Sequence, residues 1–387
     1  MTLAAAVGQS RLLNGHEAAQ RATHQALENL TGVPAGLGIV IFSQSYNAQE
    51  VLTGAAALLG NTPLLGFSTP AVFSSLGQAS RAVVVAILAS TEMQIRANWW
   101  PDFAEDSRTV IETLVDEFHL HEQTGGALLA FADGLRGDGA LLSNLLPHGF
   151  QVAGALVGGD FYRGRSMQMG GSLCGDAGLA AAMLEGPFVI GIGSAHGWEP
   201  VGTIMEVTHS RGPWIRTIDN KPASEKYADV LGYESRDWLF PPLNQLVRLY
   251  PLGIEQKDST ELRICSPIRV EADGSLRMNM PVPDGAASYM MLGSAEACQR
   301  AAQRATNQAL ANLGGVRPVF ALVLVDIAWK MLMDSDPGRE FAVVQAVLGM
   351  DVPIAGGYVL GQVERQQNDE HVKAYNQNIQ VVLFGEV

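Results

Sequence analysis

Continuous apolar runs of strand length alternate along the chain with segments of helical periodicity. The runs Leu37–Phe42 and Ala127–Ala132 end at the polar residues Ser43 and Asp133, which is typical of buried strands. Segments with apolar residues at helical spacing precede and follow each run, and the same succession returns around Phe320–Val325. The pattern predicts a unit of helix, strand, helix and strand that occurs about three times, with a glycine late in the second strand.

The first and last units also share a stretch of sequence. Ala18–Val33 reads AAQRATHQALENLTGV and Ala301–Val316 reads AAQRATNQALANLGGV, so that 13 of 16 residues are identical. Each copy predicts an amphipathic helix whose apolar stripe is mostly alanine, which allows close packing against a neighbouring element. The identity indicates an internally repeated unit and predicts two lobes related by pseudo-symmetry.

A β-rich stretch lies between the second and third units. Gly202–Thr208 and Trp214–Ile218 alternate as strands around a turn at Gly212-Pro213. With 387 residues the chain is long enough for two domains that each bury a core. We expect an α/β (mixed α+β) fold in which mixed β-sheets are covered by helices, with domains of residues 1–218 and 219–387.

Composition and charge exclude several classes of function. The net charge of −14, without any cluster of lysine and arginine, argues against binding to nucleic acid or to an anionic membrane surface. Cys174, Cys265 and Cys298 lie apart without metal-ligand spacing, which favours a reducing compartment. No apolar run reaches the roughly 20 residues of a membrane-spanning helix, and the N-terminus lacks the basic region of a secretory signal. We therefore expect a soluble cytoplasmic protein.

Glycines near the ends of the late strands mark the candidate ligand site. Glycine lets a ligand or another backbone approach closely, and the adjoining residues supply polar groups. Recurrence in three units predicts that these bends converge on one cavity, whereas the alternative is tight strand packing or β-bulges. The expected ligand-binding residues of the bends are Ser68, Thr69, Gly158, Gly159, Asp160, Tyr358, Gly361 and Gln362.

Two further positions complete the candidate site. Arg263 interrupts an apolar strand pattern, so that it either points inward to an anionic partner or lies solvated on an edge strand. Asn376 belongs to an amide-rich segment suited to hydrogen-bonding a small polar ligand, or to a simple turn. No residue pattern indicates a metal, a cofactor or a catalytic nucleophile. Asp160 and His196 are the acid–base groups on which an enzyme would depend.

The order of motifs resembles the FIST (F-box and intracellular signal transduction) family. The matching segments of the first domain are GIVIFSQSYN, PLLGFSTPAV, ALLAFADGL, VAGALVGGDF and GWEPVGTIMEVTHSRGPWI, and those of the second are TIDNKPASEKYADVLG, YPLGI, LRICSPIRVEADGSLRMNMPVPDG and PIAGGYVLGQV. The resemblance implies FIST N-terminal and C-terminal domains and the sensing of small ligands, with amino acids as the proposed class. It supplies no catalytic residues.

Two departures from the family pattern concern the third unit. The segment Asp326–Lys330 stands where the family tends to have Cys-Ala-Gly-Arg, and Gly361-Gln362 stands where it tends to have Gly-Glu. Any function of that thiol, arginine or carboxylate is therefore not expected here.

The sequence thus predicts a sensory protein of signal transduction that binds an amino acid or a similar small polar metabolite. It would act through a separate signalling output protein or by forming a homo-oligomer. Two alternatives stay open, namely a hydrolase or transferase of a small metabolite and a protein-interaction scaffold without a ligand.

Overall fold

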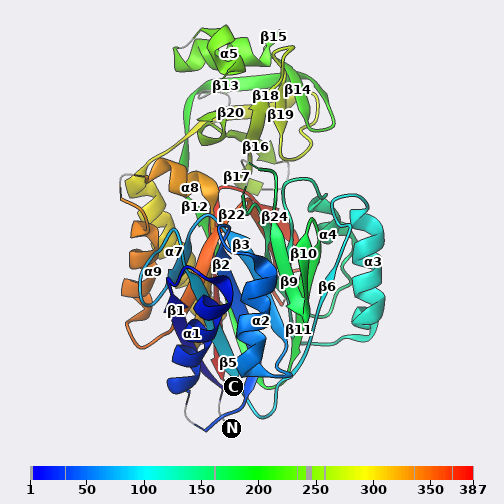
Figure 1. Ribbon diagram of the computed structural model, residues 1–387. Helices are drawn as coiled ribbons and strands as arrows, with labels where there is room; N and C mark the ends of the chain where they lie inside the picture. Colours follow the sequence, from blue (N-terminus) through cyan, green and yellow to red (C-terminus); the bar gives the residue numbers. More distant parts are fainter. Residues whose placement is uncertain are drawn as a thin grey trace. The chain divides into compact units, whose positions relative to one another are not determined.

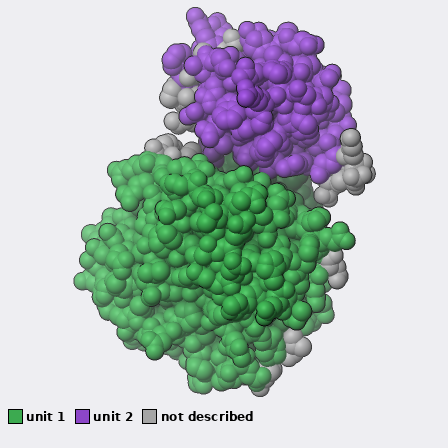
Figure 2. Space-filling view, turned by 90° about the vertical axis from the view of Figure 1, so that its right-hand side faces the viewer, with its two compact units in different colours: residues 1–196, 299–330, 335–387 green, residues 197–298, 331–334 purple. Residues whose placement is uncertain are grey.

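The computed structural model describes residues 3–30, 32–160, 163–232, 234–240, 246–256, 259–334, 336–367 and 369–386. These residues form helices and mixed sheets, which confirms the predicted α+β class. The chain divides into two compact units that are not consecutive in sequence (Figure 2). Unit 1 comprises residues 1–196, 299–330 and 335–387, and unit 2 comprises residues 197–298 and 331–334. The division into sequence domains at residue 218 stays a prediction.

Three sheets build unit 1. The first has the order β1 (Ala4–Ser10), β5 (Val83–Ala89), β2 (Ala35–Ser43), β3 (Leu64–Thr69), β9 (Met167–Gly171), β10 (Leu173–Asp176). The second has the order β24 (Lys373–Tyr375), β23 (Gly361–Arg365), β8 (Gln151–Val157), β7 (Ala127–Asp133), β11 (Leu179–Glu185), β6 (Gln94–Trp100). The third has the order β12 (Phe188–His196), β25 (Asn378–Glu386), β21 (Pro318–Asp326), β22 (Ile354–Val359), β4 (Val72–Ser74).

The three sheets share one succession of four strands, namely β1-β5-β2-β3, β6-β11-β7-β8 and β12-β25-β21-β22. The last two strands of each succession are parallel and the other neighbours are antiparallel. The strands predicted at Leu37–Phe42, Ala127–Ala132 and Phe320–Val325 lie within β2, β7 and β21. A common strand order does not by itself establish a repeat, so the repeated unit and the pseudo-symmetric lobes stay predictions.

Each succession is extended by a strand from another part of the chain. The chain leaves β3, β8 and β22 and adds β4, β9 and β23, respectively, to a different sheet. Accordingly β4 pairs with β22, β9 with β3 and β23 with β8, all antiparallel. The three sheets therefore exchange strands in a cycle, and none of them is complete without a strand from another.

The inner faces of the three sheets enclose the main core of unit 1. Phe67 of the first sheet meets Phe131 of the second with ring centroids 4.6 Å apart, and Phe384 of the third belongs to the same cluster. Burial of this apolar surface is the dominant stabilising contribution. Helices cover the outer faces (Figure 1), namely α1 (Gly15–Glu28), α2 (Ala48–Leu59), α3 (Ser107–Glu117), α4 (Ala140–Leu145), α7 (Ala295–Asn312) and α9 (Arg339–Leu348). The short helix α8 (Ile327–Leu332) directly follows β21.

Helices α1 and α7 use the alanine stripe of the shared sequence to approach a strand closely. A Cβ atom on Gly8 of β1 would lie 2.0 Å from the carbonyl oxygen of Ala22. A Cβ atom on Gly193 of β12 would lie 2.0 Å from the carbonyl oxygen of Ala305, the residue equivalent to Ala22. In both helices the alanine stripe thus packs against a glycine of the neighbouring strand.

A polar seam crosses the core between the second and third sheets. Gln362 on β23 donates from Nε2 to the carbonyl of Asn378 at 2.8 Å, and Gln380 on β25 donates to that of Val363 at 3.1 Å. Glu364, 3% exposed, accepts from the Ser194 hydroxyl and from Gln380 Nε2. Because burial disfavours the charged carboxylate, the pKa of Glu364 is raised above its ordinary value.

One eight-stranded sheet forms the centre of unit 2. Its order is β17 (Ser259–Cys265), β16 (Leu252–Gln256), β20 (Ala286–Gly293), β13 (Trp198–Arg211), β14 (Trp214–Ile218), β19 (Leu276–Met278), β18 (Pro267–Val270), with β15 (Lys221–Pro222) beside β14. The predicted hairpin at Gly212-Pro213 joins β13 to β14. The core contains Tyr227 of α5 (Ala223–Leu231) and the buried Trp238, which lies edge-on to Tyr250. No helix among the described residues is long and apolar enough to cross a membrane.

We predict that Gly193→Ala destabilises the protein by about 3 kcal/mol, because the added methyl group must push α7 away from β12. Urea unfolding followed by circular dichroism measures the effect. Gly36→Ala is the matched control, since a Cβ there finds its nearest neighbour at 3.4 Å, and it should change stability by less than about 0.5 kcal/mol. Equal effects of the two substitutions would contradict the close approach.

We predict that Glu364→Gln becomes increasingly stabilising, relative to the wild type, as the pH rises from about 4 to 8. The folded state holds the proton more tightly than the unfolded chain, so the contribution of Glu364 to stability is present at low pH. It is lost as the pH rises through the folded-state pKa. The change amounts to about 1.4 kcal/mol for each unit by which burial raises the pKa. Urea unfolding midpoints at several pH values measure this change, and Glu112→Gln, at an exposed position, is the control. If the stability difference between Glu364→Gln and the wild type did not depend on pH, the raised pKa of Glu364 would be refuted.

Candidate functional site

The structure brings most of the glycine-marked bends together in unit 1, at the carboxyl ends of β3, β8 and β22. A Cβ atom on Gly159 would lie 2.8 Å from Ser68 Oγ, and one on Gly158 would lie 2.7 Å from the side chain of Leu360. On the other side, a Cβ atom on Gly357 would lie 3.0 Å from Thr69 Oγ1. These glycines occupy positions where strands from different sheets touch.

The polar side chains of the bends hydrogen-bond to the chain itself. The Thr69 hydroxyl accepts from the backbone N–H of Tyr358 at 2.9 Å, and its oxygen lies 3.0 Å from the carbonyl oxygens of Ala71 and Tyr358. Ser68 Oγ accepts from the N–H of Met167 at 3.0 Å. Ser68 and Thr69 are buried, and their hydrogen bonds join β3 to its neighbour β9 and to β22 of the third sheet. These contacts are those of tight strand packing, and the ligand-binding role of Ser68 and Thr69 stays a prediction.

Tyr358 connects the bends to a buried acid. Its hydroxyl donates to Glu340 Oε1 at 2.7 Å, and burial raises the pKa of Glu340. The second carboxyl oxygen of Glu340 is buried and has no hydrogen-bond partner among the described residues. Phe73 packs between Tyr358 and Phe341, with ring centroids 4.7 and 4.8 Å away. The surroundings of Tyr358 are therefore largely apolar and closely packed.

Gln362 on the exchanged strand β23 lies close to Asn376, which directly follows β24. Gln362 donates from Nε2 to the carbonyls of Leu324 and Asn378, while its buried Oε1 has no partner among the described residues. Asn376 is 6% exposed, and its Oδ1 lies 3.1 Å from the position of a Cβ on Gly361. Gln362 belongs to the polar seam between two sheets, and Asn376 lies next to Gly361 beside it.

The Asp160 side chain bonds within its own turn, and Arg263 belongs to unit 2. Asp160 Oδ1 accepts from the N–H of Arg163 at 3.1 Å, and the Arg163 guanidinium lies 3.7 Å from the other oxygen, so the carboxylate stabilises its own turn. Arg263 is exposed on β17, the edge strand of the sheet in unit 2, and follows the solvated alternative of the sequence analysis. Within the described ranges no group of three or more His, Cys, Asp or Glu side chains is arranged to hold a metal.

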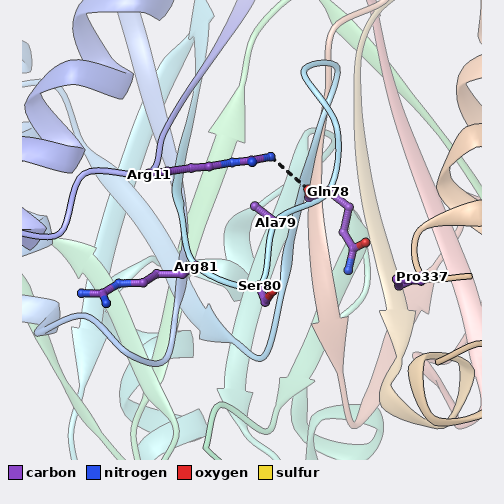
Figure 3. Close-up of a pocket in the computed structure, with 6 residues that line it drawn as sticks. All are labelled: Arg11, Gln78, Ala79, Ser80, Arg81 and Pro337. Atoms are coloured by element: carbon purple, nitrogen blue, oxygen red, sulfur yellow. Dashed lines mark hydrogen bonds between the residues drawn. The ribbon is translucent and has the colours of Figure 1, made fainter. Parts of the chain in front are cut away.

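A pocket with a volume of about 270 Å³ opens on unit 1 (Figure 3). Arg11 comes from the segment between β1 and α1, residues 78–81 come from the segment before β5, and Pro337 precedes α9. The Ser43 hydroxyl, at the end of β2, donates to the carbonyl of Ser80 at 2.8 Å. The pocket is therefore anchored to the carboxyl end of a central strand. It is lined by Arg11, Gln78, Ala79, Ser80, Arg81 and Pro337.

The lining of the pocket is cationic and polar. Arg11 reaches across to Gln78, where its Nη2 donates to the backbone carbonyl at 3.3 Å (Figure 3). Arg81 donates to the carbonyl of Leu13 at 3.1 Å and its guanidinium lies over the ring of Tyr46. The Arg81 side chain extends away from Gln78 and Ser80 (Figure 3), so the pocket offers the guanidinium of Arg11, an amide and a hydroxyl. With no carboxylate among the described lining residues, this set favours a small anionic group such as a carboxylate.

Sequence reasoning did not find the pocket residues. Arg11 and Arg81 are separated by 70 positions in the chain and belong to no motif, so only the pairing of β1 with β5 brings their segments together. The one available signal was the presence of these arginines in a chain with net charge −14.

Comparison with known proteins identifies the family. The FIST N domain model matches residues 36–221, and the FIST C domain model matches residues 223–364. Nothing among the curated proteins matches the chain. Similar solved structures include phosphoribosylformylglycinamidine synthase II from Thermotoga maritima, with 12% identity and a TM-score of 0.23, and T. maritima PurL complexed with ADP, with 12% identity and a TM-score of 0.25. Each match covers 100% of this chain and 72% of the other protein's chain, and at these TM-scores the likeness carries no inference. The two family matches together span most of the sequence, and the chain belongs to the FIST family.

Proposed function

We propose that this protein is a sensor that binds a small carboxylate-bearing metabolite, such as an amino acid, and passes the signal to a separate output protein. FIST domains are associated with sensing in signal transduction, which supports the general role. The observation that carries the finer proposal is the pocket beside Arg11, Gln78, Ser80 and Arg81 at the carboxyl end of the central strands. Ligands of α/β proteins commonly bind at this end of a sheet.

The chemistry of the pocket suits a carboxylate. A guanidinium has five N–H donors, and only one bond from Arg11, to the Gln78 carbonyl, appears among its described hydrogen bonds. The remaining donors of Arg11 can form a charge-assisted pair with a carboxylate of the ligand. The amide of Gln78 and the hydroxyl of Ser80 can bond to a second polar group of the ligand.

The pocket is connected to the exchanged strands. Val72 of β4 and Ala79 of the lining exchange both backbone hydrogen bonds, and β4 completes the third sheet beside β22. A ligand that orders residues 78–81 would favour one arrangement of β4 and its neighbours over another. The output protein or a second copy of the chain would respond to the larger population of that arrangement.

The enzyme alternative has less support. It would require Asp160 or His196 as the acid–base group, and Asp160 is occupied by its turn and by Arg163. The scaffold alternative predicts that no small molecule binds at all, so the binding experiment below separates it from the sensor.

We predict that at least one member of a panel of amino acids and small carboxylic acids raises the melting temperature of the protein by mass action. Arg11→Gln should weaken that ligand roughly 10- to 100-fold, because a hydrogen bond to a charged group contributes about 1.5–3 kcal/mol. Isothermal titration calorimetry measures the affinity. Native mass spectrometry of the freshly purified protein searches for a ligand outside the panel.

The matched control is Arg21→Gln, which removes an exposed arginine from α1 without touching the pocket. It should leave the affinity within about twofold of the wild type. A ligand that binds Arg11→Gln as tightly as the wild type would place the site elsewhere. A panel without any shift, together with a mass free of bound ligand, would favour the scaffold.

A further inference from the structure

A row of cationic and aromatic side chains crosses one face of the sheet in unit 2. Arg211 lies directly opposite Trp214, Trp214 opposite Arg277, and Arg277 opposite Arg269, on the neighbouring strands β13, β14, β19 and β18. Directly opposite residues of antiparallel strands point to the same face. The four side chains therefore form one line across four strands.

The line lies on the face away from the core. The neighbouring line of residues, one position along each strand, includes Ile215, Leu276 and Val270, which are 0%, 0% and 6% exposed and belong to the core of the unit. Since successive residues of a strand alternate between faces, the arginine line points outward. Trp214 is 39% exposed, a large aromatic surface for an outward position.

The charges of this line are only partly neutralised. Arg269 pairs with Glu271 at 3.0 Å, and the Arg277 guanidinium lies over the Trp214 ring, 5.7 Å from its centroid. Neither Arg211 nor Arg277 has an ion pair among the residues that the structure describes. The nearby carboxylates are engaged elsewhere, Asp284 with Ser210 and His209, and Asp273 with Ser275. A chain of net charge −14 thus displays two unneutralised arginines beside an exposed tryptophan.

We infer that this row (Arg211, Trp214, Arg277 and Arg269) is the docking surface for an acidic, extended segment of the output protein. The inference rests on the proposed function in one respect, namely that a sensor needs a partner. Carboxylates of the segment pair with Arg211 and Arg277, and an apolar side chain packs against Trp214, since arginine and tryptophan dominate binding energies at protein interfaces. Neighbouring strands are about 4.8 Å apart, so the row spans about 14 Å, the length of four or five extended residues.

Charge and ring geometry favour an acidic peptide over single-stranded nucleic acid. A nucleic acid base binds a tryptophan by stacking on its ring, and the Arg277 guanidinium already lies over that ring. A long polyanion would also meet the repulsion of the net negative chain, whereas a short segment interacts mainly with the row.

The test uses the full chain and a fluorescein-labelled decapeptide of alternating glutamate and valine, with an otherwise identical glutamine–valine peptide as control. Fluorescence anisotropy at low salt should show saturable binding of the acidic peptide. The double variant Arg211→Gln/Arg277→Gln should bind at least about tenfold more weakly. Lys221→Gln/Arg236→Gln removes the same charge from two exposed, ion-paired positions of unit 2 and should stay within about twofold of the wild type.

Three outcomes would overturn the proposal. They are no saturable binding of the acidic peptide up to about 1 mM, equal weakening by the two double variants, and tighter binding of a ten-nucleotide oligothymidylate that depends on Trp214. Unchanged melting temperatures show that the variants fold. Arg11→Gln should leave the affinity for the peptide unchanged, so that failure of the pocket and failure of the row are distinguishable.

Discussion

The exchange of strands among three sheets is the constraint on which unit 1 depends. After β3, β8 and β22 the chain crosses to a different sheet and pairs there through β4, β9 and β23. An unpaired sheet edge would leave backbone N–H and C=O groups without partners, so each crossing satisfies the edge of one sheet with a strand from another. The crossings also hold the sheets around one apolar core, which includes Phe67, Phe131 and Phe384. Loss of any one crossing would expose an edge and open that core.

This constraint decides what the glycine-marked bends can do. At the crossings the glycine backbone of one strand lies against side chains of a neighbouring strand, where a Cβ atom would be crowded, and the hydroxyls of Ser68 and Thr69 join the strands. We therefore propose that chemistry directed at a ligand comes from the loops just outside the crossings. The pocket beside Arg11 and Arg81 lies in such loops, and its attachment to β2 and β4 connects it to the crossings.

The sheet of unit 2 covers a core with only one of its faces. On the other face lies the line of Arg211, Trp214, Arg277 and Arg269. Alternation along the strands sorts side chains strictly between these faces. The same alternation that buries Ile215 and Leu276 aligns arginine and tryptophan outside. A ligand site in one unit and a partner surface in the other would give a sensor separate input and output regions.

The sequence by itself determined the properties that depend on local order. Apolar periodicity identified β2, β7 and β21 and the helices around them, and the alanine stripe indicated close packing before its glycine counterparts Gly8 and Gly193 were known. Motif order also indicated the family. Strand β1 escaped notice because its alanine-rich sequence has weak β propensity. Only the tertiary structure decided which strands exchange between sheets. It also decided that Ser68 faces a backbone amide and that Arg11 contacts Gln78. Pairing between distant strand edges depends on contacts that no local pattern records, and the residues lining the pocket become neighbours only through that pairing.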